Sequence, residues 1–247
     1  MRLENKSVIV TGSGRGIGEY IAKRLAREGA NVIVTGRTAR DIENVSKEIN
    51  DAGGNSIFIK GDVTIEKDVK EVIHKTIKEF GEVDMLVNNA GKGLKKYIWE
   101  TGVEEFEEVM DVNVKGTFLY MKNIIPEMEN STGLIINISS GAGKEGIPEL
   151  GAYCASKFAV IGLTESAALE VNNVKIVALC PGSVDTGMFK RLFPGEKADL
   201  KPEEVAEKVA DVCMHPGKYR RRQILPFLRR VLLMPRYYVK QPVSEHH

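Results

Sequence analysis

Short apolar runs alternate along the chain with longer stretches in which apolar residues recur every three or four positions. The short runs have the length of buried strands, and several are dense in Val and Ile. They lie at Ser7–Thr11, Asn31–Thr35, Ser56–Lys60, Met85–Asn88, Leu134–Ser139 and Lys175–Cys180, with a shorter run at Gln223–Leu225. The longer stretches predict helices over Ile17–Glu28, Ala39–Ala52, Val69–Phe80, Val103–Met128, Tyr153–Glu170 and Pro202–Met214.

Strands that alternate with crossover helices predict an α/β fold, with a doubly wound parallel sheet covered by helices on both faces. Residues 1–247 contain no repeat, low-complexity tract or linker, and their number fits a single domain. Such a sheet binds its ligand at the carboxyl ends of its strands, so functional residues should follow strands directly. Residues 183–200 form a long predicted loop, and we interpret it as a mobile substrate loop.

The composition excludes several classes of protein. The formal net charge is +1, which gives no electrostatic reason to expect a nucleic-acid partner. Three scattered cysteines (Cys154, Cys180 and Cys213) do not make a disulfide framework, and no Cys/His cluster has the spacing of a metal site. No signal peptide is evident, and no apolar run approaches the ~18 residues that span a bilayer. We therefore expect a cytoplasmic protein without a metal.

A glycine-rich turn follows the first strand and opens the first predicted helix. Its glycines lie at Gly12, Gly16 and Gly18. Glycine allows a positive φ and a close backbone approach to a ligand, and the amides at a helix N-terminus favour a phosphate. A flexible turn would have the same composition, but the strand–turn–helix context favours a dinucleotide site. We assign its cofactor contacts to Gly12, Ser13, Arg15, Gly16, Ile17 and Gly18.

The end of the second strand indicates which nicotinamide nucleotide binds. NAD-binding sites usually have an Asp or Glu there that accepts from the ribose 2′-hydroxyl. This chain has Gly36 and then Arg37, while Asp41 falls later, inside the next helix. Arg37, with help from Arg15, could bind a 2′-phosphate through its planar guanidinium. NADP(H) is therefore favoured, and the alternative is an exposed Arg37 with NAD(H) as the cofactor.

Asp62 and Val63 follow the third strand. At this edge of the sheet Asp62 could accept a hydrogen bond from the adenine amino group. It could equally serve as a turn or helix-capping residue.

In this order and spacing the motifs resemble those of the short-chain dehydrogenase/reductase family. The matching residues are Thr11–Gly18, Asp62-Val63, Asn88–Gly91, Asn113, Ser140, Tyr153–Lys157 and Pro181-Gly182. Together they span about three quarters of the chain, from Lys6 to Thr186.

The resemblance implies a seven-stranded Rossmann fold and a catalytic set of Asn113, Ser140, Tyr153 and Lys157. Ser140 is selected over Ser139 because the family places its serine thirteen residues before the tyrosine. It also implies that a nicotinamide cofactor is bound by the residues that follow the later strands. Those residues are Asn89, Ala90, Gly91, Tyr153, Lys157, Pro181, Gly182, Val184 and Thr186.

The spacing of Tyr153 and Lys157 suits proton transfer. Four residues apart on a predicted helix, their side chains share one face. A free tyrosine has a pKa near ~10, and a neighbouring ammonium should lower it toward the range of a general acid/base. Ser140 would donate to the substrate oxygen, and in the family Asn113 would hold a water that resupplies protons through Lys157. These roles predict reversible hydride transfer between a ketone or aldehyde and the corresponding alcohol.

Apolar residues dominate the two loops expected around Tyr153, so we expect a hydrophobic carbonyl or alcohol substrate. The assigned substrate contacts are Leu94, Tyr97, Met188, Phe189, Leu192 and Phe193. The alternative is that these side chains pack on the protein or on a partner subunit.

The C-terminal tail, residues 218–247, departs from the family pattern. Basic and apolar residues replace the glycine-rich strand that helps many bacterial members to form tetramers, so the resemblance does not extend to that contact or to an acyl-carrier substrate. Such a tail could pack on the domain or in a homo-oligomer (dimer or tetramer), or it could lie peripherally on an anionic membrane. A catalytically silent NADP sensor and a membrane-surface assembly protein are the competing functions on the same fold.

Overall fold

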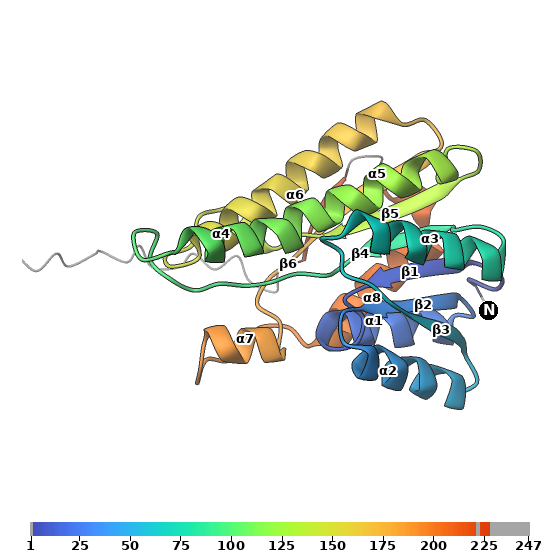
Figure 1. Ribbon diagram of the computed structural model, residues 1–247, viewed down its shortest axis with the longest axis horizontal. Coiled ribbons are helices and arrows are strands. Elements are labelled where there is room, and N and C mark those ends of the chain that lie inside the picture. Colours follow the sequence, from blue (N-terminus) through green and yellow to red (C-terminus); the bar gives the residue numbers. More distant parts are fainter. Residues whose placement is uncertain (1, 221–222, 228–247) are drawn as a thin grey trace, which may run out of the picture.

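A parallel sheet runs through the middle of the molecule, with helices on both sides (Figure 1). The computed structural model describes residues 2–220 and 223–227. Seven strands lie in the order β3-β2-β1-β4-β5-β6-β7, and every neighbouring pair is parallel. The strands are β1 (Ser7–Thr11), β2 (Asn31–Gly36), β3 (Asn55–Lys60), β4 (Met85–Asn88), β5 (Gly133–Ile138), β6 (Val174–Pro181) and β7 (Ile224–Phe227). The predicted doubly wound sheet is confirmed.

Two layers of helices cover the sheet. One layer contains α1 (Gly16–Arg27), α2 (Ala39–Asp51) and α8 (Pro202–Met214). The other contains α3 (Glu66–Phe80), α4 (Val103–Met110), α5 (Gly116–Met128) and α6 (Gly151–Glu170) (Figure 1). Side chains alternate along β1, so that Val8 and Val10 enter the first core and Ile9 enters the second. Both faces are therefore buried, which explains the unbroken apolar runs of the strands.

The order of the strands reverses beside β1. The chain moves from β1 outward to β2 and β3, then crosses back to place β4 on the other side of β1. Helices that leave β1 and β4 go to opposite faces of the sheet, which opens a crevice at the carboxyl ends of these strands. The glycine-rich turn follows β1, so the topology places it at this crevice.

The structure differs from the predicted elements in two places. The helix predicted over Val103–Met128 is interrupted by a π-helical turn at Asp111–Lys115, between α4 and α5. The loop predicted over residues 183–200 contains a short helix, α7 (Gly187–Leu192), which begins where the Thr186 hydroxyl accepts from the Phe189 amide. A capping threonine thus starts a helix that hydrophobic periodicity could not reveal in so short a segment.

The described beginning of the tail packs on the domain. Tyr219 is buried, and its hydroxyl is hydrogen bonded to Asp211 of α8. The ammonium of Lys218 lies 3.2 Å from the same carboxylate. Residues 221–222 and 228–247, which hold most of the predicted basic and apolar tail, lie outside the described residues.

The three cysteines are free thiols. Within residues 2–220 and 223–227 no group of His, Cys, Asp and Glu side chains could hold a metal ion. Over the same residues, no helix is both long and apolar enough to cross a membrane.

Candidate active site

The glycine-rich turn packs directly against the segment that follows β4. Gly12 and Gly16 have positive φ angles of 63° and 58°. A Cβ at Gly12 would lie 2.8 Å from the Cα of Ala90, and one at Gly18 would lie 2.4 Å from Nδ2 of Asn89. Glycine is therefore required here both for the backbone conformation and for the close contact between the two segments.

Polar contacts lock the same two segments together. The hydroxyl of Thr11 accepts from the backbone amides of Asn89 and Ala90, both at 3.0 Å. The Asn89 side-chain amide donates to the carbonyl oxygens of Thr11 and Gly12 at 2.9 and 3.2 Å. Asn89 thus shapes the glycine turn. Thr11 is part of this arrangement, although the sequence assignment of cofactor contacts did not include it.

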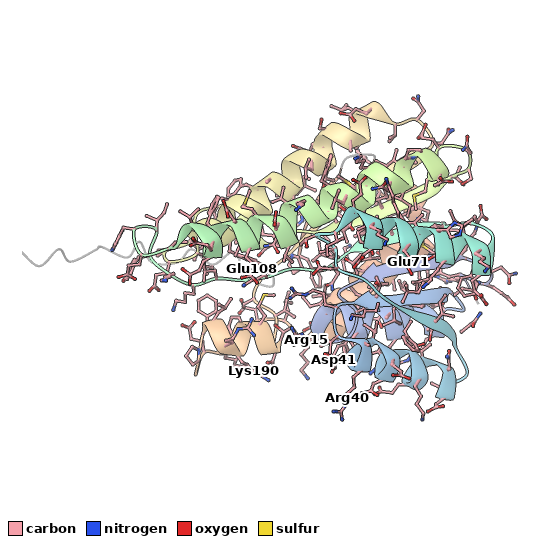
Figure 2. All side chains as sticks on the ribbon, viewed as in Figure 1. Arg15, Arg40, Asp41, Glu71, Glu108 and Lys190 are labelled. Atoms are coloured by element: carbon pink, nitrogen blue, oxygen red, sulfur yellow. The ribbon has the colours of Figure 1, made fainter. Side chains whose placement is uncertain are left out.

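The start of α1 fits a phosphate group. Among the described residues, no side chain caps this helix, whose N-cap is Arg15. Its first-turn amides and the positive end of its dipole therefore face the crevice. Arg15 is exposed near this end of the helix (Figure 2). The donors present at the turn are those that a dinucleotide phosphate requires.

Ser13 is placed differently from the other predicted contacts of the turn. Its hydroxyl donates to the carbonyl oxygen of Val10 at 2.6 Å and accepts from the Thr35 amide at 3.0 Å. The side chain is fully buried and braces β1 against β2. Only the backbone of Ser13 is left to contact a phosphate.

Arg37 lies at the end of β2 with 60% of its side chain exposed. Its Nη1 atom is 3.9 Å from Oδ2 of Asp62. The other Asp62 oxygen accepts from the amide and the hydroxyl of Thr64 at 2.9 and 2.8 Å. Asp62 therefore stabilises a turn, which is the structural alternative considered for it, while one oxygen faces Arg37. The neighbouring Val63 packs on the start of α5. A Cβ added at Gly116 would lie 2.7 Å from Cγ2 of Val63.

Asp41 is closer to the site than its sequence position suggested. A Cβ at Gly14 would lie 2.9 Å from the Cβ of Asp41, so the first turn of α2 rests against the glycine turn. Figure 2 shows Arg15, Arg40 and Asp41 at the same corner of the molecule. The sequence argument set Asp41 aside because it falls beyond the end of the second strand, inside the next helix, but the first turn of α2 packs against Gly14 and so places it at this corner.

Ser140, Tyr153 and Lys157 meet at the carboxyl end of β5. Tyr153 lies in the first turn of α6, and the Ser140 side chain is close enough to lower the pKa of its hydroxyl. The Ser140 oxygen also accepts from the amide of Ala142 at 3.2 Å, in a short 3-10 turn over Gly141–Gly143. The neighbouring Ser139 is turned away, since its hydroxyl donates to the Lys157 carbonyl oxygen at 2.9 Å. The geometry therefore places Ser140, and not Ser139, against the tyrosine.

Burial displaces both ionisable groups of this set toward their neutral forms. It raises the pKa of Tyr153, and the neighbouring Ser140 side chain acts in the opposite direction. It lowers the pKa of Lys157 to about 8. The Lys157 ammonium donates to the Ile138 carbonyl oxygen at 2.9 Å and lies 5.7 Å from the centroid of the Tyr153 ring. The expected lowering of the Tyr153 pKa by Lys157 is not seen: desolvation of the phenol dominates, and the Lys157 ammonium is directed to the Ile138 carbonyl oxygen.

Asn113 lies within the π-helical turn, and both the oxygen and the nitrogen of its side-chain amide are hydrogen bonded. Its Oδ1 accepts from the Lys92 amide at 2.7 Å, and its Nδ2 donates to the Lys92 carbonyl oxygen at 2.9 Å. Nδ2 also donates to the Ser156 hydroxyl at 2.8 Å. A Cβ at Gly91 would lie 3.4 Å from Asn113 Oδ1 and 3.6 Å from Lys157 Nζ, so this glycine leaves space between the two residues. π turns of this kind often occur at functional sites.

The α7 segment follows β6, so it lies at the carboxyl ends of the strands, an edge that we call the mouth of the site. At its start, the methyl group of Thr186 would be 3.8 Å from a Cβ at Gly16. Further along, Leu192 and Met188 pack against Gly93. A Cβ added at Gly93 would lie 2.6 Å from the Leu192 side chain and 3.1 Å from that of Met188. Its end, Phe193, joins the apolar cluster that includes Tyr153. The segment thus extends from the glycine turn to the cluster that contains Tyr153.

Other predicted contacts are distributed around this mouth. Phe189 packs on Phe193, with ring centroids 5.2 Å apart, and Leu94 is partly buried. Tyr97 instead stacks on Trp99 at the exposed surface, at 4.7 Å between centroids. Behind the mouth, Pro181 ends β6, the Gly182 amide donates to the Phe227 carbonyl oxygen at 3.0 Å, and Val184 is buried.

Comparison with known proteins agrees with this geometry. Residues 6–197 match the short chain dehydrogenase family. An uncharacterized oxidoreductase of Thermotoga maritima is 38% identical over 213 residues, which cover 85% of this chain and 82% of that protein. An uncharacterized oxidoreductase of Staphylococcus saprophyticus is 36% identical, over 88% of this chain and 94% of that protein.

Solved structures show the same architecture. Levodione reductase superposes with a TM-score of 0.85 at 26% identity, over 91% of this chain and 96% of that one. A 3-ketoacyl-(acyl-carrier-protein) reductase from Brucella melitensis, complexed with NADH, gives a TM-score of 0.82 at 31% identity, over 90% and 96% of the two chains.

Proposed function

Because the chain belongs to the short-chain dehydrogenase family, and so is an oxidoreductase that acts on CH–OH groups, we propose that it interconverts a hydrophobic ketone or aldehyde and its alcohol with NADP(H). The observation that carries this proposal is the convergence of Ser140, Tyr153 and Lys157 beside the glycine turn. Two similar structures are named as reductases, which supports a carbonyl substrate.

The crevice fits a nicotinamide nucleotide. Uncapped amides at the start of α1 would hold the phosphates, and Gly91 leaves room beside Lys157 and Asn113. Lys157 would bind the nicotinamide ribose, while Val184 and Thr186 would contact the carboxamide. The bound nucleotide supplies or accepts the hydride.

The polypeptide would manage the proton. During reduction the Tyr153 hydroxyl donates its proton to the substrate oxygen, and during oxidation the phenolate accepts it. Ser140 donates to the same substrate oxygen as negative charge develops there. Asn113, held by Lys92 and Ser156, would position a water that returns protons through Lys157.

We propose NADP(H) rather than NAD(H) as the preferred nucleotide. Arg37 is exposed at the end of β2, where its guanidinium could leave Asp62 to bind a 2′-phosphate, and Arg15 is exposed at the neighbouring turn. The Brucella melitensis reductase, which holds NADH, supports the NAD(H) alternative for this fold. Affinities of the two nucleotides, measured on the same preparation, distinguish these cases.

The direct test is oxidation of NADPH in the presence of a panel of apolar ketones and aldehydes. We expect turnover with at least one aromatic or aliphatic ketone. Tight NADP binding without turnover of any compound in either direction would contradict the proposal and favour the silent sensor.

We also propose that the chain forms a homo-oligomer. Large apolar side chains are exposed on two adjoining helices, at Phe118 of α5 and at Phe158 and Leu169 of α6. Burying such side chains against a second copy would remove apolar surface from water.

A further inference from the structure

We propose that Lys95 is a specificity-determining residue, whose ammonium fastens α7 over Tyr153 and so limits the size of the carbonyl substrate. The inference rests on the proposed function, because it concerns access to the same tyrosine. Lys95 lies in the segment between β4 and α4, on the side of the mouth that faces α7.

Lys95 contacts two groups in the described part of the chain, and the first of them, Glu149, is held in place by the backbone. The Lys95 ammonium lies 3.4 Å from the carboxylate of Glu149. Next to this pair, the Lys96 amide donates to the Glu149 carbonyl oxygen at 2.6 Å, and Lys96 forms a parallel bridge with Leu150. Glu149 has a positive φ of 63°, a conformation that a non-glycine residue keeps only when its surroundings hold it there. The backbone bridge therefore sets the position of Glu149 and, through it, of Lys95.

The second group that Lys95 contacts is Phe193, at the end of the α7 segment. The same ammonium lies 4.9 Å from the centroid of the Phe193 ring, within the range of a cation–π interaction. Phe193 ends the α7 segment and packs in the cluster that contains Tyr153, Ile147 and Leu150. Lys95 thus contacts an aromatic ring of the α7 segment that packs in the same apolar cluster as Tyr153.

The α7 helix itself is short and lightly packed, while the two ends of its segment are joined by the bridge between Val184 and Leu200. The helix has six residues, none of them fully buried, and Thr186 caps its start. Met188 and Leu192 also pack on the bare backbone of Gly93, in the segment between β4 and α4. Loss of the Lys95 interaction should therefore let Phe193 withdraw, which would widen the site above Tyr153.

The experiment compares Lys95→Met, which removes the charge, with Lys95→Arg, which keeps it. The matched control is Lys96→Met, because Lys96 is the adjacent lysine but pairs with Glu105 at 2.8 Å and not with α7. Each variant is assayed with a graded series of small and bulky aryl ketones. Amide hydrogen exchange is followed in α7, where the amides of Lys190 and Phe193 are hydrogen bonded to Thr186 and Phe189.

We expect Lys95→Met to raise the kcat/KM of bulky relative to small ketones about fivefold and to speed exchange in α7 by a similar factor, the size of one cation–π interaction. Lys95→Arg and Lys96→Met should stay within about twofold of the unaltered enzyme in both measurements. Unchanged exchange in Lys95→Met, or faster exchange with an unchanged substrate preference, would overturn the proposal. A failure of the unaltered enzyme to turn over any ketone would contradict the proposed function instead, and the exchange measurement would still test the fastening of α7.

Discussion

Tyr153 and Lys157 illustrate how burial acts on single residues in this protein. Desolvation penalises the charged form of each, so it raises the pKa of the phenol and lowers that of the ammonium. The four-residue spacing predicted that the two side chains share a helix face, and they do. Spacing could not predict the sign of the Tyr153 shift, because that depends on how many atoms from other segments surround the ring.

Tyr153→Phe removes the only hydroxyl proposed to exchange a proton with the substrate. We expect kcat to fall by about 10³-fold, the usual contribution of a general acid/base, with the Kd for NADP changed less than about twofold. Stopped-flow or steady-state NADPH oxidation gives kcat, and fluorescence titration gives Kd. Retention of substantial turnover in this variant would rule out Tyr153 as the proton donor.

Arg37→Ala tests the proposed 2′-phosphate contact. Loss of a charge-assisted hydrogen bond should weaken NADP binding by about tenfold or more. The affinity for NAD should stay within about twofold, because NAD has no phosphate at that position. Calorimetric titration of both nucleotides makes the comparison, and equal weakening of the two would refute the assignment.

At the scale of elements, the predicted strands and helices were largely confirmed, since strong periodicity reports buried faces. The π turn at Asp111–Lys115 escaped prediction because one extra residue in a turn leaves the apolar pattern almost unchanged. The α7 helix escaped because six residues are too few to show a period. Both departures occur at the site. The π turn contains Asn113, and Thr186 caps the start of α7.

Gly12→Ala tests the contact between the β1–α1 turn and the β4 end. Gly12 and Gly53 both have positive φ angles, of 63° and 83°, so alanine is strained at either position. Only at Gly12 would the new Cβ meet another segment, since nothing lies within 4 Å of a Cβ at Gly53. We expect Gly12→Ala to lower the free energy of unfolding by about 3 kcal/mol and Gly53→Ala by about 1 kcal/mol.

Chemical denaturation of both variants provides this measurement. Gly12→Ala should also weaken nucleotide binding, while Gly53→Ala should leave it unchanged. Equal losses of stability at the two positions would show that the Ala90 contact contributes nothing beyond backbone strain.

For the whole molecule, burial of Lys157 has a consequence for stability. Its pKa is about 8 in the folded chain, against an ordinary 10.5. The unfolded chain therefore binds more protons between these values, so this group makes stability rise with pH across that window. Below about pH 8 the full penalty applies, on the order of 3 kcal/mol.

Lys157→Met removes the titrating group and its penalty. The free energy of unfolding of the unaltered protein, relative to the variant, should therefore increase from pH 7.5 to pH 10, as followed by urea denaturation at each pH. Parallel curves for the two proteins would show that Lys157 has an ordinary pKa in the folded state.

Assembly is the remaining prediction at this scale. Phe158→Glu places a charge on the exposed apolar face of α6 and should shift the sedimentation coefficient toward that of a monomer. Phe58→Glu is the matched control, since Phe58 is an equally exposed phenylalanine on β3, at the far edge of the sheet. The proposed homo-oligomer would be contradicted if the unaltered protein were monomeric or if the two substitutions had equal effects.

The sequence by itself determined the fold class, the family and the catalytic candidates. Alternating apolar runs record burial on both faces of a sheet, and the glycine turn with Tyr153–Lys157 depends on short-range spacing along one strand or helix. Tertiary structure alone decided the rest: the return of Asp41 to Gly14, the contact of the Ser13 hydroxyl with Thr35, and the position of Phe193 beside Lys95. These features join residues from different strand ends, and only the order of strands in the sheet brings those ends together.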